Sequence, residues 1–316
     1  MSARYGRGVA SGGVRRDMSL WPFTAASPWN TPIGSGATFE ASTDPATADL
    51  LDTAYDRDLA SWQWSHPIYW ATASDPLVTV TEDGGRIIQY RIPAGAEPAL
   101  PDITVTTSDS HMHVVQADGQ TMFEAWLFEW TSSTTATAGY VVETDLTSNG
   151  ILLGVRGYGG SAIGGLIRQR EVANRYIPHA IALAPPSEYM LFEGYVWPAT
   201  REDSTSEELY LGNIGMGTLA AIPPGVDISA LGLNADGLAL ATALQDYGLY
   251  VVDSSDAWVV YAEPGSDETR LDAMWSDMPT IRAQVRVVTN NSEANPGGPG
   301  TRRRARAPRL ILRGGA

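Results

Sequence analysis

The chain has 316 residues, a formal net charge of −15, no cysteine, 32 glycines and 20 prolines. Its length is sufficient for a hydrophobic core without disulfides, and the lack of cysteine excludes disulfides, thiol chemistry and cysteine zinc sites. The body from residue 17 to residue 301 holds 11 arginines and all 36 acidic residues, which disfavours nucleic-acid binding because this body repels phosphate.

Both ends of the chain are basic. Arginines occur at both ends without any acidic residue nearby, in residues 1–16 and again in residues 302–316. We therefore expect three parts: an extended basic arm (1–20), a single β-rich domain (21–289), and a Gly/Pro linker with an arginine-rich tail (290–316). No run of residues is long and apolar enough for a membrane span, and the N-terminus lacks the apolar stretch of a secretory signal.

The segment from residue 21 to residue 32 is rich in proline, which disfavours the interior of a helix or a sheet. We expect it to wrap around the domain and to be anchored by Trp21, Phe23 and Trp29. A short helix is expected over residues 45–58. Strands are then expected over residues 67–71, 77–81, 86–92 and 102–107.

Residues 109–130 are predicted to form a β-hairpin. Asp118-Gly119 is typical of a two-residue type I′ turn, and in that register His113 faces Glu124 while His111 faces Trp126. A turn one residue further along would place Glu124 diagonally to His113 without changing the faces. Because side chains alternate along a strand, one face would carry His111, His113, Glu124, Trp126, Phe128 and Trp130.

Short strands and loops are expected to follow the hairpin. A strand is expected over residues 139–144, and the glycine-rich stretch 154–165 is expected to be a long loop at the rim of a site. Its glycine spacing matches neither a P-loop nor a dinucleotide fingerprint. A helix over residues 167–174 leads to a strand over residues 176–184, where His179 lies in an apolar row. We interpret His179 as a hydrogen-bonded core histidine, with a catalytic role as the alternative.

The last part of the domain is expected to mix strands with one clear helix. Residues 201–208 are expected to form a solvated acidic loop, with calcium binding as the alternative. The expected elements are strands over 217–222, 249–253, 258–262 and 281–288, a helix over 236–247 and a helical turn near 271–275. The second and third of these strands are predicted to form a hairpin. This pattern predicts a mainly β protein, an antiparallel β-sandwich or jelly roll with one or two short covering helices.

Three blocks of the sequence resemble an uncharacterised family of bacterial secreted and phage-encoded proteins. The blocks are residues 27–33 (SPWNTPI), His113-Val114-Val115 with Asp118 and Glu124, and Gly165-Leu166-Ile167-Arg168 followed by Ile177-Pro178-His179-Ala180. The resemblance covers roughly residues 21–263 and implies an extracellular or virion setting and an association with glycans. Family members usually carry a signal peptide. This chain shows none, a departure that favours a protein carried on a virus particle.

The first functional hypothesis is a virion-associated fibre, spike or tail protein that recognises cell-surface polysaccharide. It would be a homo-oligomer and would bind other virion proteins through its basic ends. Aromatic side chains would stack on sugar rings, although for any single one of them a place in the core is the alternative. The substrate-binding candidates are Trp62, Trp64, Tyr69, Trp70, Trp126 and Trp130, with Asp109 beside them.

The second hypothesis is an enzyme that cleaves polysaccharide by hydrolysis or β-elimination. His113 would be the general acid or base, tuned by Glu124 and assisted by Asp109 or His111, with His179 as a further catalytic candidate. A two-carboxylate glycosidase that uses Glu124 is an alternative. A metal site made of His111, His113 and an acid would lack a further ligand, so we expect no metal and no cofactor apart from the calcium alternative. The third hypothesis is a structural decoration protein without a ligand.

Overall fold

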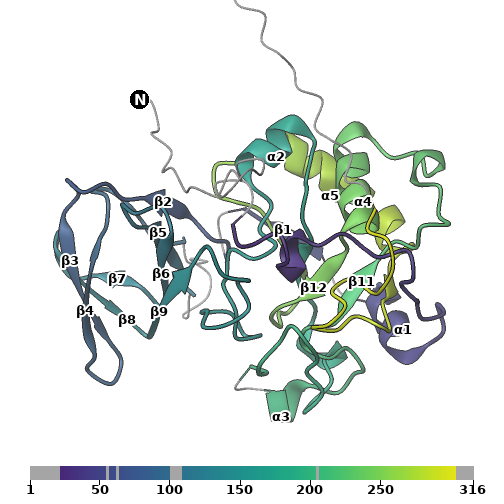
Figure 1. Ribbon diagram of the computed structural model, residues 1–316, viewed down its shortest axis with the longest axis horizontal. Coiled ribbons are helices and arrows are strands. Elements are labelled where there is room, and N and C mark those ends of the chain that lie inside the picture. Colours follow the sequence, from purple (N-terminus) through teal and green to yellow (C-terminus); the bar gives the residue numbers. More distant parts are fainter. Residues whose placement is uncertain (1–21, 55–56, 62–63, 100–108, 204–205, 304–316) are drawn as a thin grey trace, which may run out of the picture.

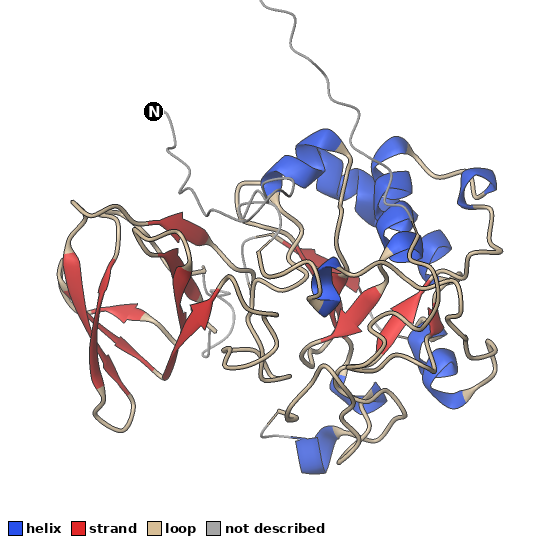
Figure 2. Ribbon diagram, in the orientation of Figure 1, coloured by secondary structure: helices blue, strands red, loops and turns tan. Residues whose placement is uncertain are grey.

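The computed structural model describes residues 22–54, 57–61, 64–99, 109–203 and 206–303. The described strands form three sheets, one with six strands and two with four strands each. Figures 1 and 2 show the six-stranded sheet with the helices on one side of the molecule, and the four-stranded sheets on the other. The predicted arm 1–20, the predicted strand 102–107 and the tail from residue 304 lie outside the described residues.

The six-stranded sheet is mixed. Its strand order is β1 (Arg57–Ala60), β13 (Trp258–Tyr261), β10 (Ile181–Ala184), β12 (Leu249–Val251), β11 (Leu219–Ala221) and β14 (Arg286–Val287). β1 is parallel to β13 and β10 is parallel to β12, whereas the other pairs are antiparallel. Because β10 lies between β12 and β13, the predicted hairpin of residues 249–253 with residues 258–262 is wrong.

The described residues contain five α-helices, and the two longest, α4 and α5, cover one face of this sheet. The helices are α1 (Pro45–Leu51), α2 (Gln169–Asn174), α3 (Ser206–Leu209), α4 (Ala235–Asp246) and α5 (Glu268–Arg282), and the 3-10 turns are η1 (Pro28–Asn30), η2 (Ser187–Tyr189) and η3 (Ile228–Ala230). The predicted helix over 236–247 is confirmed as α4. The side chain of Asn234 accepts hydrogen bonds at its start, and Gly248 follows its end with a φ of 81°. No described helix has the length and hydropathy needed to cross a bilayer.

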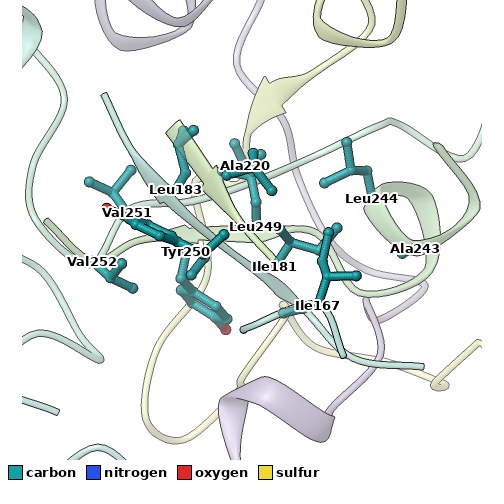
Figure 3. Close-up of a cluster of buried hydrophobic side chains, with 14 of the residues drawn as sticks. Ile167, Ile181, Leu183, Ala220, Ala243, Leu244, Leu249, Tyr250, Val251 and Val252 are labelled. Atoms are coloured by element: carbon teal, nitrogen blue, oxygen red, sulfur yellow. The ribbon is translucent and has the colours of Figure 1, made fainter. Parts of the chain in front are cut away.

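Side chains on opposite faces of the six-stranded sheet pack against different partners. Leu249 points toward Leu244 of α4, and Figure 3 shows these residues together with Ile181 and Leu183. Tyr250, the next residue along β12, points to the other face and contacts Trp29, with the two ring centroids 5.4 Å apart. Trp29 is therefore buried beneath the sheet, as predicted for an anchoring residue of the segment 21–32.

The two four-stranded sheets share one hydrophobic core. Their strand orders are β2 (Ile68–Trp70), β5 (Met112–Val115), β6 (Thr121–Trp126), β9 (Tyr140–Asp145) and β4 (Ile87–Arg91), β3 (Leu77–Glu82), β8 (Thr135–Ala138), β7 (Glu129–Trp130). β2 is parallel to β5, and β3 is parallel to β8. The predicted β-rich character is confirmed. The prediction of purely antiparallel sheets is wrong, because each of the three sheets contains a parallel pair.

The register predicted for the hairpin is confirmed, although its turn is of another kind. His113 is paired with Glu124 across β5 and β6. The amide of Gly119 donates to the carbonyl of Gln116, and Gly119 has a φ of 70° while Asp118 has no positive φ. The Asp118 carboxylate accepts hydrogen bonds from the amides of Gln120 and Thr121 and so closes a four-residue loop, which preserves the register of a two-residue turn.

Residues 290–303 are the described part of the predicted Gly/Pro linker and tail (290–316), and they pack on the body. Its backbone pairs with residues 33–36, and Gly34 forms a β-bridge with Arg302. The Arg302 guanidinium donates hydrogen bonds to the carbonyls of Pro32 and Gly298. The last described residues are therefore fixed to the segment that follows η1.

Candidate functional site

The candidate site is a cleft of about 750 Å³ that is lined both by the six-stranded sheet and by the hairpin sheet. Aromatic and charged side chains from segments far apart in the sequence meet there. The aromatic ones are Trp64, Trp126, Tyr140 and Tyr261, and the charged ones are Asp109, Arg156, Arg201, Glu202, Asp203, Asp253 and Asp256. Carboxylates outnumber guanidinium groups, so the cleft is acidic.

The predicted pair His113 and Glu124 is sealed in the interior. Both residues are 0% exposed, and neither lines the cleft. Glu124 accepts hydrogen bonds from the Thr144 hydroxyl and from the Ala162 amide, and burial raises the pKa of its carboxyl group. The two residues therefore lie behind the wall of the cleft, and their predicted acid–base role toward a sugar gains no support from this geometry.

The predicted aromatic face of the hairpin ends at Trp126. Leu127 has a φ of 54°, which interrupts the alternation of side chains. Phe128 then turns into the core shared by the four-stranded sheets and packs edge-to-face on Trp130. The Trp130 indole donates a hydrogen bond to the carbonyl of Ala96. Trp130 therefore packs against the core and does not line the cleft, so its predicted role in substrate binding gains no support.

Trp126 and Asp109, by contrast, lie in the cleft as a pair. The Trp126 side chain is 38% exposed, and its Nε1 donates a hydrogen bond of 2.9 Å to an Asp109 carboxylate oxygen. This bond fixes the orientation of the indole ring. Trp64 also lines the cleft. Two other residues predicted to stack on sugars do not line the cleft. Trp70 is 42% exposed at another place on the surface, and Tyr69 packs against the core while its hydroxyl donates a hydrogen bond to the carbonyl of Glu97. Trp62 lies outside the described residues.

His179 is a core histidine. Its Nε2 lies 2.9 Å from a Glu171 carboxylate oxygen, and its Nδ1 lies 2.7 Å from the carbonyl of Ala180. Burial alone would lower the pKa of His179, but the Glu171 charge and hydrogen bond raise it. The interpretation as a hydrogen-bonded core residue therefore fits, and its catalytic alternative is not supported since His179 does not line the cleft.

The sequence analysis did not single out Arg156, which lines the cleft. Its Nη1 is 3.2 Å from Asp253 Oδ2, and its guanidinium carbon lies 3.9 Å from the centre of the Tyr261 ring. The predicted glycine-rich loop positions it: a Cβ on Gly154 would lie 1.7 Å from the carbonyl oxygen of Gly160, so only glycine allows the loop to close on itself. Arg156 and Gly157 of this loop line the cleft, which agrees with the expectation that the loop rims a site.

Asp253 is the carboxylate in the cleft with the most perturbed proton affinity. Its side chain is 19% exposed, and burial raises its pKa to about 6 although Arg156 opposes this shift. A carboxyl group with this pKa is protonated in about half of the molecules at pH 6 and in roughly a tenth at pH 7. It can donate a proton at a pH where ordinary aspartates cannot.

Three of the four histidines of the chain gather behind the cleft: His66, His111 and His113. Alternation along β5 places His111 and His113 on one side. β2 runs parallel to β5, and Ile68 is paired with His113. Counting two residues back on both segments therefore places His66 next to His111. All three imidazoles are buried, and His111 is the member of the trio that lines the cleft. The sequence analysis missed His66, because a parallel pairing between distant segments has no local signal.

Comparison with protein-family models, with curated proteins and with solved structures found no match for this chain. The resemblance described above therefore rests on its motifs alone.

Proposed function

We propose that this protein binds a neutral polysaccharide in the cleft. The observation that carries the proposal is the partly exposed Trp126 indole, held in one orientation by Asp109 within a cleft where carboxylates outnumber guanidinium groups. Aromatic rings offer apolar faces for the C–H faces of sugars, and carboxylates accept hydrogen bonds from sugar hydroxyls. An excess of carboxylates in the cleft would repel anionic glycans, so a neutral chain fits best.

The first prediction concerns Trp126. Replacing it by alanine is expected to weaken glycan binding by about 2 kcal/mol, roughly 30-fold in Kd, as is common for an aromatic residue at the centre of an interface. The measurement is affinity electrophoresis of the full chain in gels containing dextran, mannan, galactan or laminarin, followed by calorimetry with any glycan that retards it.

The matched control is Trp70→Ala, which removes an indole of similar exposure that does not line the cleft. It is expected to leave the affinity unchanged. The proposal fails if the wild-type protein binds none of the neutral glycans, or if both tryptophan variants weaken binding equally. Stronger binding to alginate than to neutral glycans would contradict the charge argument.

Glycan cleavage is a second candidate function, favoured by the raised pKa of Asp253. In this proposal Asp253 protonates the glycosidic oxygen and Asp109, the carboxylate that orients Trp126, assists the attacking water. These residues replace the buried His113 and Glu124 in the enzymatic hypothesis.

If the chain hydrolyses a glycan, Asp253→Asn is expected to lower the rate at least about 100-fold while binding persists, because the amide cannot donate an acidic proton. The rate of the wild-type enzyme should fall as the pH rises through about 6, since Asp253 acts only when protonated. Release of reducing ends is the measurement, and Asp272→Asn, an exposed change on α5, is the control. A rate that is insensitive to Asp253→Asn would rule out this mechanism.

Placement on a virus particle stays part of the proposal and is supported only by the sequence, through the basic ends and the family resemblance. The same holds for a homo-oligomer, for an extracellular or virion location and for attachment to other virion proteins. The alternative of a decoration protein without a ligand is the outcome if no glycan is bound. Calcium in the loop 201–208 gains no support from Glu202, whose two carboxylate oxygens accept hydrogen bonds from the amides of Glu193 and Gly194.

A further inference from the structure

We propose that His66, His111 and His113 form a site for a divalent transition-metal ion, with zinc as the ion that the ligands fit best. The inference goes beyond glycan binding and does not depend on it. It rests on the convergence of the three imidazoles, on nitrogen atoms that lack partners, and on the groups that fix the rings.

The three imidazoles converge from two parallel strands. Each residue offers a nitrogen atom, and these atoms all lie within 4.8 Å of one another. The centroid of the His66 ring lies 4.6 Å from the centroid of the His111 ring and 5.1 Å from that of the His113 ring. Three nitrogens around a tetrahedral zinc ion at about 2.1 Å are separated by roughly 3.4 Å. Displacements of less than about 1 Å for each ring, within reach of rotations about χ2, would therefore close the site.

Several of these nitrogens have no hydrogen-bond partner among the described residues, although they are buried. They are both nitrogens of His66, Nδ1 of His111 and Nε2 of His113. A buried polar atom without a partner costs about 1 to 3 kcal/mol, so one such atom in each of three adjacent rings calls for an explanation. A bound cation coordinated by one nitrogen from each ring would provide a partner for three of these four nitrogens at once.

The His113 nitrogen that would not bind the ion has a hydrogen-bond partner, as is usual for histidine ligands of metal ions. His113 Nδ1 lies 3.2 Å from the carbonyl oxygen of Pro67, so Nδ1 carries the proton and the Nε2 lone pair is free. His111 is similarly held by a hydrogen bond to the backbone of Ala125. Such outer contacts fix the tautomer and the orientation of histidine ligands.

The electrostatic surroundings keep the rings neutral, which metal binding requires. Burial is the main cause that lowers the pKa of His66 and of His111, the latter to about 3, and the charge of Arg156 is the second cause. Burial also lowers the pKa of His113. The charge of Arg156 acts on all three rings, and Asp253 pairs with this guanidinium at 3.2 Å. Two further carboxylates flank the trio: Asp109 Oδ2 is 4.0 Å from His111 Nε2, and Glu124 Oε2 is 3.9 Å from His113 Nε2.

The ligand set decides the class of ion. Three imidazoles suit zinc and its transition-metal neighbours, whereas calcium and magnesium prefer oxygen ligands. The sequence analysis expected no metal because two histidines and an acid were under-ligated, and His66 supplies the missing ligand. A fourth coordination position remains for water, as in zinc sites with three protein ligands.

The test uses the full chain without a histidine tag, stripped with a chelator and then titrated with zinc by calorimetry and with cobalt by visible absorption. We expect one ion per chain, a cobalt spectrum typical of nitrogen and oxygen ligands, and a rise in melting temperature on zinc addition. His66→Ala and His113→Ala are each expected to weaken binding at least about 100-fold. His179→Ala, which removes the fourth buried histidine of the chain, is expected to leave stoichiometry and affinity unchanged.

Two results would overturn the site: a wild-type chain that binds none of zinc, cobalt, nickel and copper, or zinc binding that survives His66→Ala unchanged. If the alanine variants do not fold, X-ray absorption of the zinc-loaded wild-type protein replaces them. Three imidazole nitrogens around the ion support the proposal, and a shell of oxygens overturns it. None of these measurements involves a glycan, so the outcome is independent of the function proposed for the cleft.

Discussion

Replacing Trp29 by alanine is expected to lower the free energy of unfolding by about 3 to 5 kcal/mol, the usual cost of deleting a buried aromatic side chain. Trp29 is 2% exposed and packs edge-to-face on Tyr158 and Tyr250, with ring centroids at 6.0 Å and 5.4 Å. A Cβ on Gly164 or Gly165 would lie within 2.6 Å of the Trp29 ring, so the neighbouring backbone is fitted to this indole. Urea unfolding of the full chain measures the effect.

Two further variants make this result interpretable. Trp29→Phe keeps an aromatic ring in contact with the two tyrosines, so its cost should be intermediate. Trp70→Ala removes an indole that is 42% exposed and should change the stability by about 0.5 kcal/mol or less. A loss below about 1.5 kcal/mol for Trp29→Ala would show that the cavity collapses, and that the core does not depend on the ring.

Replacing Glu171 by glutamine is expected to reverse the contribution of His179 to the pH dependence of stability. In the wild-type chain the folded-state pKa of His179 is raised above 6.5, so its stabilising contribution is fully present below pH 6.5 and is lost as the pH rises through the folded pKa. In Glu171→Gln the burial remains without the charge, which lowers the pKa of His179 below 6.5. Its contribution then increases with pH up to about 6.5.

Because the Glu171 and His179 side chains are 1% and 6% exposed, breaking this pair is costly. The variant should be about 3 kcal/mol less stable than wild type near pH 5. The difference should shrink as the pH rises through the folded-state pKa of His179, above which the histidine is neutral in both chains. Urea unfolding across this range measures the difference. The control is Glu129→Gln, the same chemical change at an exposed residue. A stability difference that does not vary with pH would mean that His179 is neutral throughout.

Local signals in the sequence predicted local structure well. The Asp118-Gly119 pair set the register of His113 with Glu124 even though the turn is of another type, because the same residues pair in both loops. Gly248 ended α4 as expected. The sequence analysis predicted only a helical turn near residues 271–275 and a strand over 281–288. α5 instead spans Glu268–Arg282 and continues past Pro279, with Met278 and Ile281 packed into the core.

The candidate site depended on contacts that no local pattern encodes. The cleft joins Trp64, Asp109, Arg156 and Asp253, whose distances along the chain exceed any helical or strand period. Trp126 was identified because it follows the alternation of β6. Trp130 was misplaced because the positive φ of Leu127 is held by tertiary contacts rather than by a turn residue such as glycine.

The pairing of residues 33–36 with the segment 290–303 has a mechanical consequence. Tension applied to the chain beyond Arg303 passes first to the backbone around Gly34, through the bridge at Arg302 and the hydrogen bonds of its guanidinium group. The carbonyl of Ile33 also accepts a hydrogen bond from the amide of Arg303. The amide of Ile33 in turn donates a hydrogen bond to the carbonyl of Asp246, the last residue of α4. Pulling on this end would therefore load the helical layer before it strained the sheets that line the cleft.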